Sequence, residues 1–121
     1  MELPLVRHTI VSLEFGFSLT LRTDRDFEIR IESTFRVSEP GTEVFRGVPH
    51  TLLSENGTVQ RLIGRLVAHA NASDDGGLLV EFADGTSLVV PFGADFEAWT
   101  IAAAEGFKAV SVAGGGLTVW D

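Results

Sequence analysis

The stretch 76–92 constrains the fold more than any other part of the sequence. Within it, two runs rich in aliphatic and β-branched residues flank the pair Asp84-Gly85. An Asp-Gly pair between two such runs is typical of a β-hairpin, because glycine adopts a positive φ at low cost. We therefore expect an antiparallel hairpin with Gly85 at positive φ. Pro91 marks the end of its second strand, because proline has no N–H to donate to a neighbouring strand.

Strands are expected along most of the remaining chain. Residues 17–22 and 27–32 alternate strictly between apolar and polar side chains, which is typical of an antiparallel sheet with one solvated face. In the first of these runs Phe17 is expected to face inward, and Phe35 and Val37 are interpreted as an extension of the second. Besides the hairpin, the expected strands are 9–15, 17–22, 27–32, 65–71, 96–101, 107–112 and 117–120.

The middle of the chain carries a different pattern. From Val59 onwards the apolar residues follow helical spacing, and Gly64 interrupts this spacing. Glycine commonly follows the end of a helix. We therefore expect one short helix near residues 55–63, with a strand after it. A single longer helix is the alternative.

Two parts of the sequence share one hydrophobic pattern. Residues 5–8 align with 66–69 without a gap, and the apolar phase is kept through the hairpin that follows each of them. The pattern predicts a duplicated three-stranded meander, in which each copy leaves an apolar face that the other covers. We expect a single domain, 1–121, with a pseudo-repeat of 1–37 and 62–98 and a C-terminal hairpin of 96–121.

The expected fold is mainly β: an antiparallel sandwich or partly open barrel built from two similar three-stranded meanders, with one short helix. Its core should consist of the alternate apolar residues of the strands. These are Leu19, Leu21, Ile29, Ile31, Val80, Phe82, Leu88, Val90 and Val110.

Charge and composition exclude several classes of function. The formal net charge of −8 argues against binding to a nucleic-acid backbone. Solubility alone is the simpler explanation of the acidity, and a basic protein partner is the alternative. The absence of cysteine excludes thiolate metal sites and cysteine nucleophiles and fits a reducing compartment. No signal peptide and no apolar stretch of transmembrane length are visible. We therefore expect a cytoplasmic protein that binds neither nucleic acid nor membranes.

The C-terminal half carries more distinctive motifs. The Asp-Gly hairpin is followed by Phe96-Glu97-Ala98-Trp99 and then by the terminal run 114–120, Gly-Gly-Gly-Leu-Thr-Val-Trp. With these motifs the chain resembles a family of small, mostly actinobacterial proteins catalogued as a domain of unknown function. The resemblance covers most of the chain and implies no activity. It departs from the family pattern at Ala113, where a proline is expected before the glycines.

Four residues are the candidates for a ligand or partner site. His8 and His69 are equivalent in the repeat, so a twofold arrangement of the halves would bring their imidazoles together for acid-base or metal chemistry. No other motif with metal-ligand spacing supports such a site, and polar residues at strand starts are the simpler interpretation. Trp99 and Trp120 are either core residues or partner-binding anchors, and the core is favoured for both because large aromatic side chains are mostly buried.

No sequence motif points to catalysis, so an enzyme is not expected, and neither is a cofactor or a metal. The first hypothesis is a non-catalytic protein-binding module, of the inhibitor or immunity type, directed at a basic partner. The alternative is a structural or assembly protein that acts as a homodimer, because exposed strand edges invite pairing. A second alternative is small-molecule binding in the mouth of a barrel.

Overall fold

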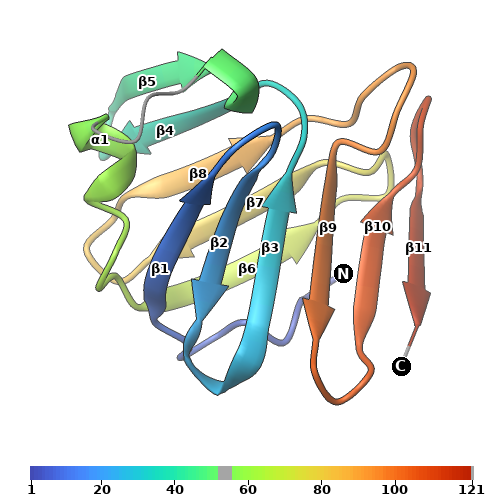
Figure 1. Cartoon of the computed structure of the whole chain (residues 1–121), viewed down its shortest axis with the longest axis horizontal. Helices are drawn as coiled ribbons and strands as arrows, with labels where there is room; N and C mark the ends of the chain where they lie inside the picture. Colours follow the sequence, from blue (N-terminus) through green and yellow to red (C-terminus); the bar gives the residue numbers. More distant parts are fainter. Residues whose placement is uncertain (52–55, 121) are drawn as a thin grey trace.

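Two antiparallel sheets packed face to face form the protein (Figure 1). The structure is a computed structural model, and it describes residues 1–51 and 56–120. The six-stranded sheet has the order β1 (Ile10–Phe15), β2 (Leu19–Thr23), β3 (Phe27–Ile31), β9 (Trp99–Ala103), β10 (Lys108–Ser111) and β11 (Leu117–Trp120). The five-stranded sheet has the order β5 (Thr42–Gly47), β4 (Phe35–Glu39), β8 (Ser87–Val90), β7 (Leu78–Phe82) and β6 (Val67–Ala72).

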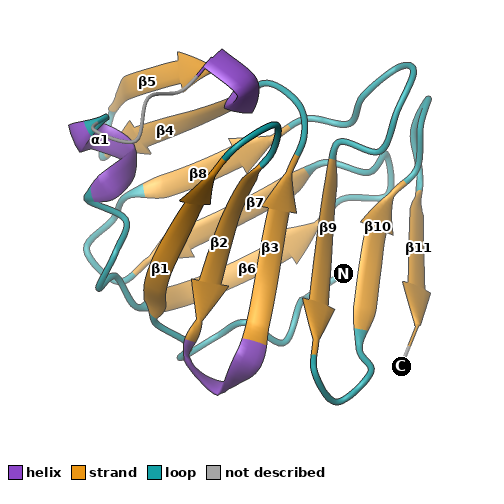
Figure 2. Ribbon diagram, in the orientation of Figure 1, coloured by secondary structure: helices purple, strands orange, loops and turns teal. Residues whose placement is uncertain are grey.

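Helical structure is restricted to short segments between strands (Figure 2). The helix α1 spans Gly57–Gln60, within the expected range 55–63, of which residue 55 lies outside the described residues. It begins at Asn56, whose side-chain oxygen accepts a hydrogen bond from the Val59 N–H at 3.1 Å. Two 3₁₀ turns, η1 (Asp24–Asp26) and η2 (Pro49–Thr51), complete the helical segments of the described chain. Among the described residues, no helix has both the length and the apolar character needed to cross a membrane.

The chain changes sheets after each of two meanders. The strands β1, β2 and β3 form a meander in one sheet, and β6, β7 and β8 form a meander in the other. After β3 the chain crosses to the five-stranded sheet, where β4 pairs with β8. After β8 it crosses back, and β9 pairs with β3. The sandwich is the expected fold, and its sheets do not close into a barrel. The duplication of sequence behind the two meanders stays a prediction.

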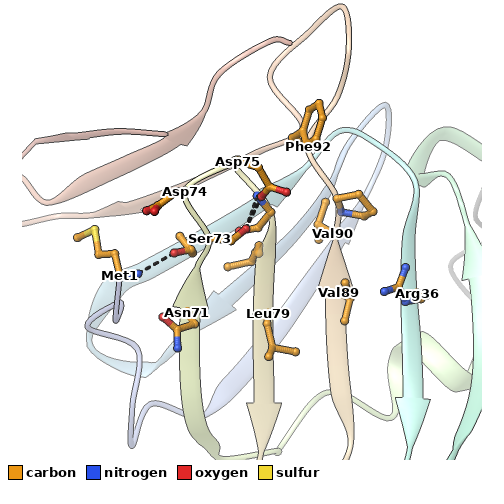
Figure 3. Close-up of a pocket in the computed structure, with 14 residues that line it drawn as sticks. Met1, Arg36, Asn71, Ser73, Asp74, Asp75, Leu79, Val89, Val90 and Phe92 are labelled. Atoms are coloured by element: carbon orange, nitrogen blue, oxygen red, sulfur yellow. Dashed lines mark hydrogen bonds between the residues drawn. The ribbon is translucent and has the colours of Figure 1, made fainter. Parts of the chain in front are cut away.

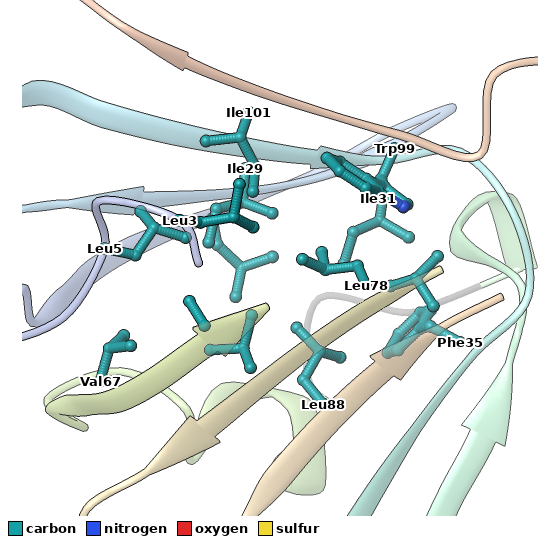
Figure 4. Packing of buried hydrophobic residues seen from close by; sticks show 14 of the residues in the cluster. Leu3, Leu5, Ile29, Ile31, Phe35, Val67, Leu78, Leu88, Trp99 and Ile101 are labelled. Atoms are coloured by element: carbon teal, nitrogen blue, oxygen red, sulfur yellow. The ribbon is translucent and has the colours of Figure 1, made fainter. Parts of the chain in front are cut away.

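The core lies between the two sheets. Figure 4 shows Ile29, Ile31, Trp99 and Ile101 of the six-stranded sheet pointing toward Leu78, Leu88 and Phe35 of the five-stranded sheet. The N-terminal residues Leu3 and Leu5 fill one side of this layer. All nine residues expected to be buried are buried, although Val110 lies outside the main cluster because it alternates with the inward-facing Ala109 and Ser111.

Three sequence expectations are wrong, and for Phe17 and for Phe35 with Val37 the reason is that the alternating pattern continues past the end of a strand. Phe17 lies in the turn between β1 and β2 and is 91% exposed, where its ring stacks on His50. Phe35 and Val37 belong to β4 in the other sheet and do not extend β3. Phe96 lies in the loop before β9, which begins at Trp99.

The hairpin of β7 and β8 has the expected turn. Gly85 has a φ of +92°, and its N–H donates to the Phe82 carbonyl at 3.0 Å. The Asp84 carboxylate accepts from the Thr86 N–H at 3.0 Å and pairs with Arg65. The pKa of Asp84 is lowered, mainly by the hydrogen bond that the Thr86 N–H donates to its carboxylate. A Cβ on Gly85 would lie 2.8 Å from Cγ of Pro40.

We expect Gly85→Val to lower the free energy of unfolding by more than about 1 kcal/mol, because a β-branched residue is disfavoured at positive φ and would meet Pro40. Urea denaturation followed by circular dichroism measures the change. Ser87→Val in the next strand is the control, and it should change stability by less than about 0.5 kcal/mol. Equal unfolding midpoints for both variants would contradict the turn assignment.

Candidate functional site

A pocket of about 600 Å³ lies on the outer face of the five-stranded sheet (Figure 3). One row of paired residues forms its floor, because Asn71 of β6 faces Leu79 of β7, Leu79 faces Val89 of β8, and Val89 faces Arg36 of β4. The walls come from the first residue of the chain, from the turn between β6 and β7 and from the start of the loop after β8. The wall residues are Met1, Ser73, Asp74, Asp75, Gly77, Pro91 and Phe92.

The two ends of the pocket carry opposite charges. Arg36 lies at the β4 end, and among the described residues it has no hydrogen-bond or ion-pair partner. The pKa of the nearby Glu43 is lowered mainly by its hydrogen bond with Arg46, and the positive charge of Arg36 lowers it further. Asp74 lies at the β6 end and likewise has no partner within the described part of the chain. Both charges are therefore available to a ligand.

Asp75, next to Asp74, has a structural role in the turn. Its carboxylate accepts hydrogen bonds from the Ser73 hydroxyl and, at 3.0 Å, from the Gly77 N–H. These two bonds lower the pKa of Asp75, and the bond from Ser73 is the larger cause. Both bonds close the turn, so Asp75 fixes the conformation of the segment that carries Asp74.

The same turn is fixed to the opposite sheet. The Gly76 carbonyl accepts two hydrogen bonds of 2.8 Å, from Nε1 of Trp99 and from Oγ of Ser111. The Asp75 carbonyl accepts a third bond, 2.9 Å long, from the Gly116 N–H. The acidic end of the pocket is therefore held in place by buried groups and does not depend on a ligand to order it.

The four residues selected from the sequence lie in different places. Trp99 is fully buried, which agrees with the core interpretation, and it supports the pocket only through the turn at Gly76. Trp120 is 50% exposed on the outer face of β11, where the Lys108 ammonium lies 5.6 Å from its ring centroid. The expectation that Trp120 packs in the core is therefore wrong, whereas the expected pairing of its strand is confirmed.

The two histidine side chains are not brought together. His8 is buried, its Nδ1 lies 3.0 Å from the Asp24 carbonyl oxygen, and its ring meets Phe27 edge-on at 4.7 Å between centroids. His69 is exposed and alternates with the inward-facing Ala70, so it points to the outer face of the five-stranded sheet. Within the described residues, no group of three or more His, Cys, Asp and Glu side chains is placed to hold a metal ion.

Sequence reasoning missed the pocket residues Leu79, Val89 and Arg36. The available signal was a break in alternation, because Leu78-Leu79-Val80 and Leu88-Val89-Val90 are apolar at three successive positions. In a sheet with one solvated face, the middle residue of such a run places an apolar side chain on the outer face. The register of β7 and β8 then brings the two outward residues together.

Comparison with protein families gives a match that extends over the whole chain, residues 1–121. The matching family is a family of unknown function, DUF6188. The chain belongs to the DUF6188 family. Comparisons with curated proteins and with solved structures found no match.

Proposed function

We propose that this DUF6188 protein is a non-catalytic protein-binding module, of the inhibitor or immunity type, and that its pocket receives an apolar side chain of a basic partner. The observation that supports the proposal is the apolar floor of Leu79 and Val89 between two free and opposite charges, Arg36 and Asp74. Three strand spacings separate β4 from β6, or about 14 Å at the usual spacing of about 4.8 Å. A short extended protein segment spans this length.

The charge of the surroundings favours a basic partner. Asp95 and Glu97, in the loop that follows the pocket wall, are exposed and have no ion-pair partner among the described residues. Phe92 and Phe96 of the same loop are 40% and 49% exposed. Exposed aromatic rings beside unpaired carboxylates provide apolar contact area together with electrostatic attraction for lysine and arginine.

The test compares the wild-type protein with two charge reversals as baits in cells of the native host. Asp74→Lys reverses the charge at the end of the pocket. Glu81→Lys is the matched control, because Glu81 is also exposed and lies on the outer face of β7 outside the pocket lining. We expect the wild type and Glu81→Lys to recover one basic protein at near-equal stoichiometry, and Asp74→Lys to lose it. Recovery should also decrease as salt is raised, because exposed charges are screened.

Two results would overturn the proposal: no stoichiometric protein with the wild-type bait, or equal recovery with Asp74→Lys. Thermal melting of all three proteins checks that each is folded. Small-molecule binding stays a second prediction, supported by a pocket volume within the usual range for ligands. A small molecule would bind in this surface pocket and not in the mouth of a barrel, because the two sheets do not close into a barrel.

A further inference from the structure

Three of the four edge strands in the described part of the chain are protected against pairing with another chain. Residues 1–8 run beside β6 and bond to its backbone, for example through the Leu3 N–H and the Ala70 carbonyl at 2.9 Å. The edge strand β1 contains a bulge and the exposed Glu14. The edge strand β5 pairs irregularly with β4 and carries Glu43 and Arg46. Covering segments, bulges and charges are the usual means of preventing edge-to-edge association.

The fourth edge, β11, has none of these features. Its residues, Leu117–Trp120, include no charge and no proline, and its register with β10 is regular. Figure 1 shows β11 at the margin of the six-stranded sheet, with no strand of the five-stranded sheet behind it. Val119 and Trp120, on opposite faces of the strand, are 37% and 50% exposed. An uncharged, regular edge with exposed apolar residues is a template for strand pairing.

The backbone pattern shows which groups of β11 are free to pair. Hydrogen-bonded and non-hydrogen-bonded pairs alternate along an antiparallel ladder. The Val112 N–H donates to the Gly116 carbonyl at 3.0 Å, at the start of this ladder. By alternation from that pair, the backbone groups of Thr118 and Trp120 face β10, and those of Leu117 and Val119 face outward.

The charge distribution favours a second copy of the chain at this edge. Two copies with a net charge of −8 each repel one another over most of their surfaces. The outer face of β9, β10 and β11 carries no carboxylate within these strands, and Lys108 is its charged residue. When β11 of one copy approaches β11 of another, no carboxylate within these three strands therefore faces one of the other copy.

We propose that β11 pairs antiparallel with β11 of a second copy about a twofold axis at Thr118, which joins two six-stranded sheets into one. In this register, Leu117 of each copy exchanges two hydrogen bonds with Val119 of the other. All outward backbone groups of both residues are then satisfied. Leu117 and Val119 of the two copies lie side by side on one face, and the two Thr118 side chains meet on the other, which is a favourable cross-strand pair.

The sharpest test is a single-cysteine cross-link, because the chain contains no cysteine of its own. In the proposed register the two Thr118 residues form a non-hydrogen-bonded pair with Cα atoms about 4.5 Å apart, within the range for a disulfide. We expect Thr118→Cys to form a covalent dimer on mild oxidation at least tenfold faster than Val44→Cys, which places a thiol on the edge strand β5. Equal rates for the two variants would overturn the proposal.

A second test uses a charge at the edge and no covalent bond. Val119→Lys places a charge in the proposed interface, and Val44→Lys is its matched control because both valines are 37% exposed on edge strands. In sedimentation equilibrium we expect the wild type and Val44→Lys to dimerise with equal affinity and Val119→Lys to dimerise at least tenfold more weakly. A strictly monomeric wild type, or a dimer that Val119→Lys leaves unchanged, would refute the pairing.

Discussion

Replacing Trp99 with alanine is expected to lower the free energy of unfolding by about 4–5 kcal/mol, the upper part of the range for buried aromatic residues. Its side chain is fully buried between the sheets, and its Nε1 donates one of the two hydrogen bonds to the Gly76 carbonyl. The substitution therefore removes core volume and a link between the two sheets. Urea denaturation followed by circular dichroism measures the loss.

Trp120→Ala is the matched control for this prediction. It removes the same side chain from a position that is 50% exposed, so its cost should stay below about 1 kcal/mol. A comparable loss of stability in the two variants would show that the core assignment of Trp99 is wrong. If β11 pairs as proposed, the control has to be measured at a concentration at which the protein is monomeric.

The second large effect is expected for Gly76→Ala, at about 3 kcal/mol. Gly76 has a φ of +96°, which costs a residue with a Cβ about 1–2 kcal/mol. An added Cβ would also lie 2.5 Å from the Gly116 carbonyl oxygen and 3.0 Å from Oγ of Ser111. The turn would have to move away from β10, and overpacking of this kind costs about 1–3 kcal/mol.

Gly64→Ala separates the two contributions. Gly64 has a similar φ of +88°, but an added Cβ would meet nothing within 4 Å. We expect this control to lose only the backbone term of about 1–2 kcal/mol. The difference between the two variants then measures the contact between the turn and the opposite sheet. Equal losses would show that this contact contributes nothing.

The local pattern predicted the strands and the turns but not the sheet to which a strand belongs. Gly85 was predictable because only the chemistry of its own turn decides its conformation. Phe35 and Val37 keep the apolar alternation of β3, and nothing in that alternation indicates that the chain crosses to the other sheet between Ile31 and Phe35. The pairing of β4 with β8 depends on residues far away in the sequence.

The candidate site was less predictable than the fold. The apolar floor was present in the sequence as two runs that break alternation, at Leu79 and Val89. The sequence did not indicate that Arg36 and Asp74 lack a hydrogen-bond or ion-pair partner among the described residues. The register of neighbouring strands decides which partners a surface charge meets. The exposed position of Trp120 also follows from a tertiary feature, since the six-stranded sheet extends one strand beyond the core.

The chain crosses to the other sheet after β3 and crosses back after β8, and these two crossings have a consequence for synthesis on the ribosome. When β1 to β5 have emerged, β3 still lacks its neighbour β9 and β4 still lacks its neighbour β8. Both edges stay unpaired until residues 87–103 have left the exit tunnel. The N-terminal half is therefore exposed to misassociation throughout elongation. Folding then proceeds by closing long loops, which is intrinsically slow, so the two open edges are covered only late in synthesis.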